Sequence, residues 1–173
     1  AHSHMGRALV AYYQATGDPR ILEAMVRVYR DYPLPDLPAN FYPVSGAVNV
    51  DPMLDVYTLS GETAILDRVL AQSRSDTTVQ SMEAWLNDNW SDQLHTVIVN
   101  ENIRVPALLH PWTGRPEHLE VSRAALRWLE NEHGLPFGLA SGEEYLAGRG
   151  ATRHLETCNL AAAAWTLGTM LRQ

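Results

Sequence analysis

The sequence predicts an all-α protein built from helical hairpins. One pattern occurs three times: an apolar or aromatic helix end, a Thr-Gly or Ser-Gly pair, a charged residue and then a Leu. It is found in residues 12–22, 56–66 and 109–119. Apolar residues between these segments recur at the spacing of one helix face, as in Met5, Leu9 and Tyr12. No window shows the alternation expected of a buried strand. These observations predict hairpins placed side by side, as in a bundle, a solenoid or a toroid.

The three glycines of this pattern are expected to end helices. Gly17, Gly61 and Gly114 each follow an apolar helical segment. Glycine is favoured just after a helix because it adopts the left-handed backbone conformation without a steric penalty. Pro19 and Pro116 stand two residues after their glycines, where proline suits the first turn of the next helix. The repeat unit is therefore a helical hairpin with a longer return loop.

The first half of the chain is expected to form two hairpins joined by an irregular linker. The second helix places Ile21, Leu22 and Met25 on one face. Residues 31–43 contain four prolines, which cannot continue a helix. The helices predicted in this half span residues 3–15, 19–31, 46–59 and 62–72.

The second half is expected to hold a hairpin, a long loop and a final helix. Ser91 or Asp92 suits the N-cap of the longest helix, and Pro106 is expected to bend it. A loop at 134–154 separates the last two helices. The helices predicted in this half span residues 79–89, 93–110, 116–132 and 156–171.

Length and composition indicate an ordinary globular domain. The 173 residues are 46% hydrophobic and 19% charged, which allows a sizeable core. A net charge of −7 gives no support for nucleic acid or an anionic membrane as partner. No apolar run is long enough to span a membrane. One cysteine excludes an internal disulfide, so a cytoplasmic protein is favoured over a secreted one.

The loop before the last predicted helix is the stretch most typical of a functional site. Residues 134–158 contain five glycines and no helical period, yet their aromatic and apolar residues argue against disorder. Long loops on a rigid scaffold usually carry function. The polar residues of interest in and beside this loop are His133, Glu143, Glu144, His154, Glu156 and Cys158.

Three segments of the chain resemble a known enzyme family. They are SHMGRALVAYYQATGDPRIL (3–22), HTVIVNENIRVPALLHPWTGRPEHLEVSRAALRWLENEHG (95–134), and SGEEYLAG (141–148) followed by ETC (156–158). The chain resembles the catalytic domain of the β-L-arabinofuranosidase family, glycoside hydrolase family 127 and its relatives. The resemblance implies an (α/α)6 toroid with a central active site, of which residues 1–173 form a truncated, single-domain segment. It also implies a carbohydrate substrate and removal of terminal L-arabinofuranose with retention, by a zinc-bound cysteine nucleophile and a glutamate acid/base.

The same resemblance assigns roles to residues of the loop. Glu156 and Cys158 of the ETC motif correspond to two of the zinc ligands. Glu144 or the neighbouring Glu143 corresponds to the general acid/base. Glu144 is preferred because its spacing to Leu146 matches the family better.

The resemblance also assigns roles to two histidines and shows two departures. His4 and His95, near the starts of predicted helices, correspond to sugar-binding residues. Some members of the family carry a histidine where this chain has Ala47. The family's adjacent cysteine pair, which includes the nucleophile, has no counterpart in these residues. The chain by itself is therefore expected to lack the attacking group and to be inactive alone.

Each assigned residue type also has an ordinary structural explanation. Glu156 and Cys158 are two positions apart and can meet only from a turn or a helix N-terminus, and a lone cysteine is most often buried in a core. Glu143 and Glu144 are most typical of a solvated acidic turn. Burial beside an apolar wall such as Tyr145 would favour the protonated acid that catalysis needs.

The histidines and asparagines are open to similar alternatives. His4 and His95 are as typical of ordinary helix starts as of a sugar site. Asn49 and Asn100 lie near helix starts and are weaker candidates for a pocket. The remaining histidines, expected to be structural or solvated, are His110, His118, His133 and His154.

A second class of function fits the same sequence. A non-catalytic module of helical repeats could bind a carbohydrate or a protein partner through the loop at 134–154. In either case, part of a toroid would leave apolar helix faces uncovered, so self-association through these faces is expected.

Overall fold

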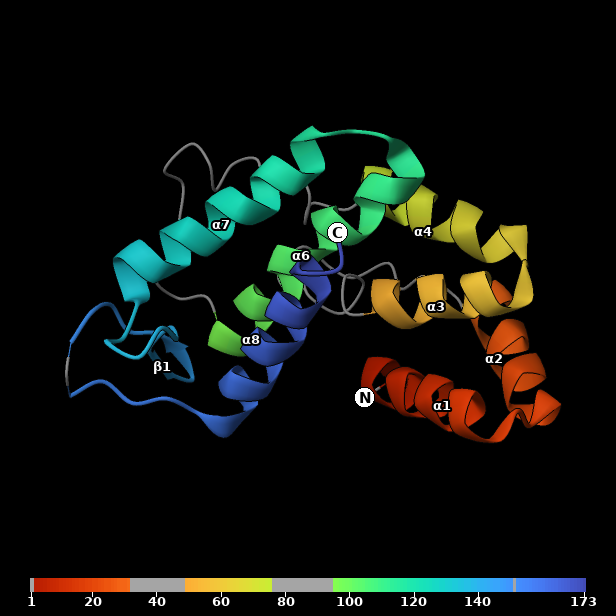
Figure 1. Ribbon diagram of the computed structural model, residues 1–173, viewed down its shortest axis with the longest axis horizontal. Helices are drawn as coiled ribbons and strands as arrows, with labels where there is room; N and C mark the ends of the chain where they lie inside the picture. Colours follow the sequence, from red (N-terminus) through yellow and green to blue (C-terminus); the bar gives the residue numbers. More distant parts are fainter. Residues whose placement is uncertain (1, 32–48, 76–94, 151) are drawn as a thin grey trace. The chain divides into compact units, whose positions relative to one another are not determined.

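The structure, a computed structural model, describes residues 2–31, 49–75, 95–150 and 152–173 (Figure 1). These residues form seven helices and one short β-hairpin, which confirms the predicted all-α class. The predicted helix at 79–89, the proposed caps Ser91 and Asp92, and Ala47 lie outside the described residues.

The helices lie close to the positions that the sequence predicts. The helix predicted at residues 19–31 has those bounds, and the others differ by a few residues at their ends. No helix in the described part of the chain combines the length and apolar character needed to cross a membrane. The helices are α1 (His2–Thr16), α2 (Pro19–Asp31), α3 (Val50–Ser60), α4 (Thr63–Ser75), α6 (Thr96–Thr113), α7 (Glu117–His133) and α8 (Thr157–Met170).

The chain groups into two compact units, and the single, truncated domain expected from the sequence stays a prediction. The first unit is Ala1–Thr77 and the second is Thr78–Gln173. Helical hairpins bury their apolar faces mainly against their sequence neighbours, so local groups of hairpins can each form a core. The two units are described separately below.

The first unit consists of the α1–α2 and α3–α4 hairpins. α1 and α2 both pack against α3, and α2 also contacts α4. Gly6 permits the close approach of α1 to α3, because a Cβ at Gly6 would lie 2.9 Å from the Cβ of Pro52. Arg7 and Asp51 form a buried ion pair at 3.1 Å between the same two helices.

The three predicted glycine turns are confirmed. Gly17, Gly61 and Gly114 have φ values of +67°, +73° and +64°, all in the left-handed region. In each turn the glycine N–H donates to the carbonyl of the residue four positions earlier, at 2.7 to 2.9 Å. α2 starts at Pro19, and Pro116 is the N-cap of α7, close to the first-turn positions predicted for these prolines.

The hydroxyl residue before each glycine completes the turn. Thr16, Ser60 and Thr113 each donate their hydroxyl hydrogen to the carbonyl oxygen four residues earlier, at 2.7 to 2.9 Å. The same hydroxyl oxygen accepts the backbone N–H two residues later, at 3.2 to 3.4 Å. The Thr-Gly or Ser-Gly pair therefore satisfies backbone groups that a helix end leaves unpaired.

Asp18 follows Gly17, directly precedes α2 and bonds to the first turn of that helix. The Asp18 carboxylate accepts the backbone N–H of Arg20 at 3.0 Å, as an N-cap residue does. Hydrogen bonds from the Arg20 guanidinium lower the pKa of the Asp18 carboxyl.

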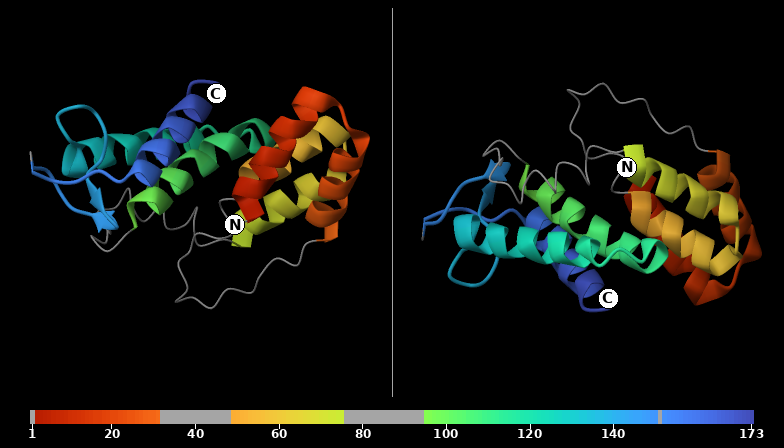
Figure 2. Two further views of the ribbon diagram at one scale, coloured as in Figure 1. Left: turned by 90° about the horizontal axis from the view of Figure 1, so that it is seen from below. Right: turned by 90° about the horizontal axis from the view of Figure 1, so that it is seen from above.

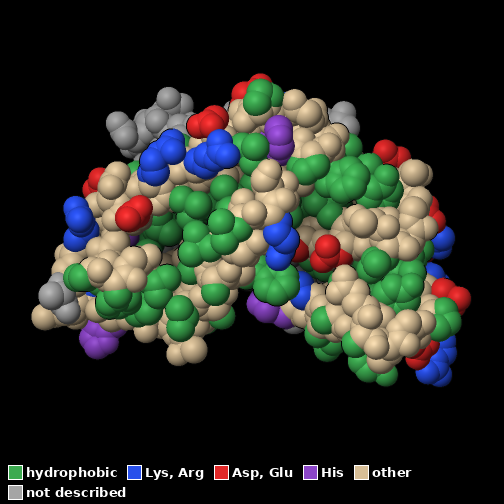
Figure 3. Space-filling view, in the orientation of Figure 1, with side chains coloured by type: hydrophobic (Ala, Val, Ile, Leu, Met, Phe, Trp, Pro, Cys, Tyr) green, Lys and Arg blue, Asp and Glu red, His purple; other side chains and the backbone are tan. Residues whose placement is uncertain are grey.

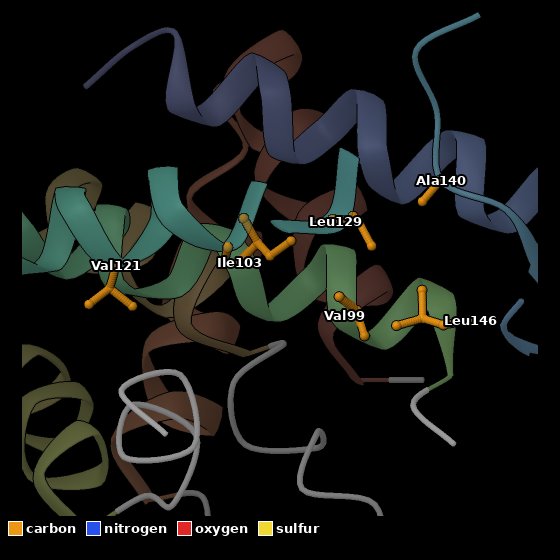
Figure 4. Close-up of a cluster of buried hydrophobic side chains, with 7 residues drawn as sticks. Val99, Ile103, Val121, Leu129, Ala140 and Leu146 are labelled. Carbon is orange, nitrogen blue, oxygen red and sulfur yellow. The ribbon is translucent and has the colours of Figure 1, made fainter. Parts of the chain in front are cut away.

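The second unit is built around α6, which packs against α7 on one side and α8 on another. Figure 4 shows the core that these elements share with the loop after α7. α6 supplies Val99 and Ile103, and α7 supplies Val121 and Leu129. Because Leu146 of the β-hairpin belongs to the same buried cluster, the hairpin is anchored to the helices by apolar contact.

The longest helix runs continuously through two prolines. α6 contains Pro106 and Pro111. The backbone N–H of Ala107, next to Pro106, donates to the Ser122 hydroxyl of α7 at 3.1 Å. The cost of a proline in a helix is thus partly offset by a hydrogen bond that α6 donates to the neighbouring helix.

The loop at 134–154 has more structure than the sequence indicates. Strand β1 (Gly142–Glu143) pairs antiparallel with β2 (Tyr145–Leu146), and isolated bridges join Gly134 to Ala140 and Gly142 to Leu155. Each strand has only two residues, so no alternating pattern could reveal it. The loop is therefore a folded segment that positions the residues it carries.

Alanine substitutions at two glycines of the second unit test whether the left-handed backbone of the Gly114 turn requires glycine. A methyl group at Gly114 or Gly168 would meet no atom within 4 Å, and only Gly114 has a positive φ. Gly114→Ala is expected to lower the free energy of unfolding by about 1–2 kcal/mol. Gly168→Ala, inside α8, is expected to leave it unchanged or raise it by up to about 1 kcal/mol. Urea unfolding followed by circular dichroism measures both, and equal losses would contradict the role given to the turn.

Candidate functional site

The candidate site lies at one end of the second unit. The views in Figures 1 and 2 agree that the β-hairpin lies where α7 ends and where α6 and α8 begin. His95 is the N-cap of α6, and Glu156 is the N-cap of α8. Two helix N-termini, each with partial positive charge, therefore face the same region as the acidic hairpin, an arrangement that favours carboxylates.

Glu144 contacts α6 through both its side chain and its backbone. Its carboxylate lies 3.3 Å from His95 Nε2. Its carbonyl oxygen accepts the N–H of Thr96, the first residue of α6, at 3.1 Å. Next to it, the Tyr145 ring meets the His95 ring edge to face, with centroids 6.3 Å apart. These contacts fix the hairpin on the start of α6.

The backbone of Glu144 is strained. Glu144 has a φ of +73°, the one positive value at a non-glycine residue within the described ranges. A left-handed conformation costs a residue with a side chain about 1–2 kcal/mol. Such strain persists when surrounding contacts hold it in place, and it is concentrated at functional sites. It directs the Glu144 carbonyl to α6 while the carboxylate reaches His95.

Glu156 and Cys158 meet at the N-terminus of α8, as their spacing requires. The Cys158 Sγ lies 3.6 Å from a Glu156 carboxylate oxygen. Cys158 is exposed, which excludes the expectation of a buried core cysteine.

Three of the predicted site residues come together. One ligand atom from each of His95, Glu144 and Glu156 lies within 4.8 Å of the other two. Cys158 adjoins this group through Glu156. Imidazole, carboxylate and thiolate are the ligands that zinc favours, and a tetrahedral zinc site places ligand atoms about 3.3–3.6 Å apart. The group and the adjoining Cys158 therefore offer donor types that zinc accepts, and the sequence assigns Glu156 and Cys158 among them to the metal.

The two adjacent glutamates differ in their surroundings. Glu143 points to Arg153, with a carboxylate-to-guanidinium distance of 4.0 Å, whereas Glu144 belongs to the cluster. The Glu144 side chain is 61% exposed and the Glu143 side chain 45%. The apolar burial that was considered for one of them is therefore absent in the structure.

The clustered group contains none of the other predicted residues that the structure describes. His4 is exposed on α1, in the first unit, so its assignment as a sugar-binding residue stays a prediction. His118 and His133 are buried, in agreement with a structural role. Asn100 is also buried, and its side chain forms a hydrogen bond with α8.

Buried hydrogen bonds fix the position of α8 on α6. The side-chain amide N–H of Asn100 on α6 donates to the side-chain oxygen Oδ1 of Asn159 on α8, at 2.5 Å. The Asn159 amide donates in turn to the backbone carbonyl of Ala140 in the loop, at 2.9 Å. Asn159 lies three residues after Glu156, so this bridge sets the position of the α8 N-terminus relative to both α6 and the loop.

A second set of bonds lies further along the same helices. Arg104 is fully buried and forms an ion pair with Glu101, also on α6. Arg104 also donates to the Thr166 hydroxyl of α8 at 3.2 Å, and that hydroxyl donates to the Asn100 carbonyl at 2.5 Å. Sequence reasoning missed these residues, although charged residues among apolar ones in α6 were a visible signal for a buried network.

Comparison with protein-family models, curated proteins and solved structures finds no match to this chain. The family resemblance therefore stays a prediction, and the site is interpreted from its own geometry.

Thr166 tests whether these buried hydrogen bonds hold the two helices together. Thr166→Val keeps the side-chain shape but leaves an Arg104 N–H and the Asn100 carbonyl without this partner. It is expected to lower the free energy of unfolding by about 2–4 kcal/mol. Thr166→Ser keeps the hydroxyl and loses one methyl group, at a cost of about 1 kcal/mol. Urea unfolding that shows Ser to be more damaging than Val would contradict this account.

Proposed function

We propose that this chain forms part of the active site of a retaining glycoside hydrolase that removes terminal β-L-arabinofuranose or a related sugar. The helical hairpins would belong to an (α/α)6 toroid with the cluster at its centre. The observation that carries the proposal is the convergence of His95, Glu144 and Glu156. The sequence resemblance assigns all three residues to one site, although His95 lies 49 positions before Glu144 in the chain.

Glu144 is proposed to donate a proton to the glycosidic oxygen that leaves. Its exposure leaves its carboxyl accessible to a substrate, and its contacts with Thr96 and His95 hold it in one place. General acid catalysis of this kind typically contributes 10²–10⁴-fold to a rate. Glu143 is the weaker candidate, because it faces Arg153 and lies outside the cluster.

His95 is proposed to orient the sugar and the acid. Its Nε2 lies 3.3 Å from the Glu144 carboxylate, so the imidazole can hold that acid in place. A sugar hydroxyl can donate to or accept from an imidazole nitrogen, so the same side chain is proposed to position a bound sugar.

Glu156 and Cys158 are proposed to hold zinc. Zinc, when bound, would keep a cysteine sulfur in the thiolate form that attacks carbon. The attacking cysteine is proposed to be a residue other than Cys158. Most retaining glycosidases use a second carboxylate as nucleophile, and a thiolate would take that place here.

The surface of α8 agrees with a larger assembly. Figure 3 shows hydrophobic side chains among polar ones on the face that includes α8. The large apolar residues exposed on or just after α8 are Leu160, Trp165, Leu167 and Leu171. Apolar faces of this kind favour contact with further protein, either the rest of the proposed toroid or a second copy of the chain. Self-association of the chain remains a prediction.

Zinc binding can be tested by titration of the purified chain. Glu156→Gln is expected to weaken Zn²⁺ affinity by about 10-fold or more, because it removes a charged ligand. Glu143→Gln changes an exposed glutamate of the same loop outside the cluster and is expected to leave the affinity unchanged. Isothermal titration calorimetry measures both variants. Equal affinities for the two variants would remove Glu156 from the metal site.

Glu144 can be tested with the full-length protein that contains this chain. With an alkyl β-L-arabinofuranoside, whose leaving group needs a proton, Glu144→Gln is expected to lower kcat by about 10²–10⁴-fold. With a nitrophenyl glycoside, whose leaving group needs little protonation, the loss is expected to be smaller. Glu143→Gln serves as the matched control and is expected to retain activity.

Two outcomes would contradict this role. Equal rates for the wild type and Glu144→Gln would reject Glu144 as the acid. Sugar binding by the full-length protein without any hydrolysis would favour the alternative, a non-catalytic carbohydrate-binding module.

A further inference from the structure

The segment that carries Glu144 is held at both ends by one residue of α7. The backbone carbonyl of His133, the last residue of α7, accepts the N–H of Ser141 at 2.7 Å. Its imidazole Nδ1 accepts the N–H of Gly148 at 2.9 Å. Ser141 directly precedes β1, and Gly148 lies two residues after β2. His133 therefore closes the base of the hairpin from both sides.

The position of His133 is itself well fixed. The residue is 4% exposed, and its ring packs against the Trp128 ring with centroids 4.9 Å apart. Because Nδ1 accepts a backbone N–H, it carries no proton in this arrangement, so a neutral imidazole has its proton on Nε2. The acceptor that holds Gly148 is thus presented by a rigid, packed side chain.

The two ends of the hairpin are also joined to each other. The Ser141 hydroxyl donates to the Gly148 carbonyl at 2.5 Å, and Ser141 is fully buried. Gly148 has a φ of +72°, so the chain turns sharply at the point where His133 holds it. These bonds confine the six residues between Ser141 and Gly148 to a closed loop.

This closed loop holds the strain at Glu144. The left-handed backbone of Glu144 is unfavourable by about 1–2 kcal/mol and would relax if the hairpin were free. Relaxation would move the carbonyl from Thr96 and the carboxylate from His95. We propose that His133 is a positioning residue that holds Glu144 in its productive conformation through the Gly148 hydrogen bond. This inference rests on the proposed function, in which Glu144 is the acid.

Two substitutions of His133 in the full-length protein separate the hydrogen bond from the packing. His133→Phe keeps an aromatic ring against Trp128 but removes the acceptor for the Gly148 N–H. His133→Asn loses the ring but keeps an oxygen acceptor near the position of Nδ1. With the alkyl glycoside, Phe is expected to lower kcat per folded molecule by about 10–100-fold, as small misplacements of catalytic groups do, with little change in KM. Asn is expected to restore most of kcat.

Backbone amide exchange, measured by NMR on the same variants, gives a readout that needs no activity. Faster exchange of the Thr96 and Gly148 amides in His133→Phe, but not in His133→Asn, is the result expected from the hydrogen bond. Unchanged exchange and kcat in the Phe variant, or equal losses in both variants, would overturn the positioning role. If the wild type has no glycosidase activity while the amides respond as expected, the proposed function fails and the clamp on the hairpin stands.

Discussion

The contact on which the second unit depends is the buried hydrogen-bonded bridge between α6 and α8. Asn100 and Asn159 bond to each other, and Asn159 also holds the loop through the Ala140 carbonyl. Apolar packing can be satisfied by several offsets of one helix along another, whereas a buried amide is satisfied in few of them. The bridge thereby selects one register, and this register brings the N-caps His95 and Glu156 into one cluster.

The β-hairpin brings Glu144 to the start of α6, next to His95. It is anchored by Leu146 in the core, by the Thr96 N–H at the start of α6, and by His133 at its base. These anchors hold Glu144 in a conformation that an isolated peptide would avoid. Favourable contacts in the surrounding structure can keep a residue in a strained backbone conformation, and such residues are concentrated at functional sites.

The helices were largely predictable and the cluster only in part. Gly17, Gly61 and Gly114 end helices for a local reason, the conformational freedom of glycine, and all three turns have the predicted form. The pairing of Glu156 with Cys158 also follows from local spacing at a helix start. The β-hairpin and the burial of Arg104 did not follow, because strands of two residues have no period and Arg104 is covered by α8, where the distant Thr166 accepts its hydrogen bond.

The sequence by itself determined the helices, their turns and the chemical types available to a site, because these depend on residues within a few positions of one another. Only the tertiary structure decided which carboxylate joins His95 and which faces Arg153, since Glu143 and Glu144 are neighbours of the same type. That choice depends on the backbone conformation of the hairpin. Contacts from α6 and α7, more than ten residues away in sequence, impose this conformation.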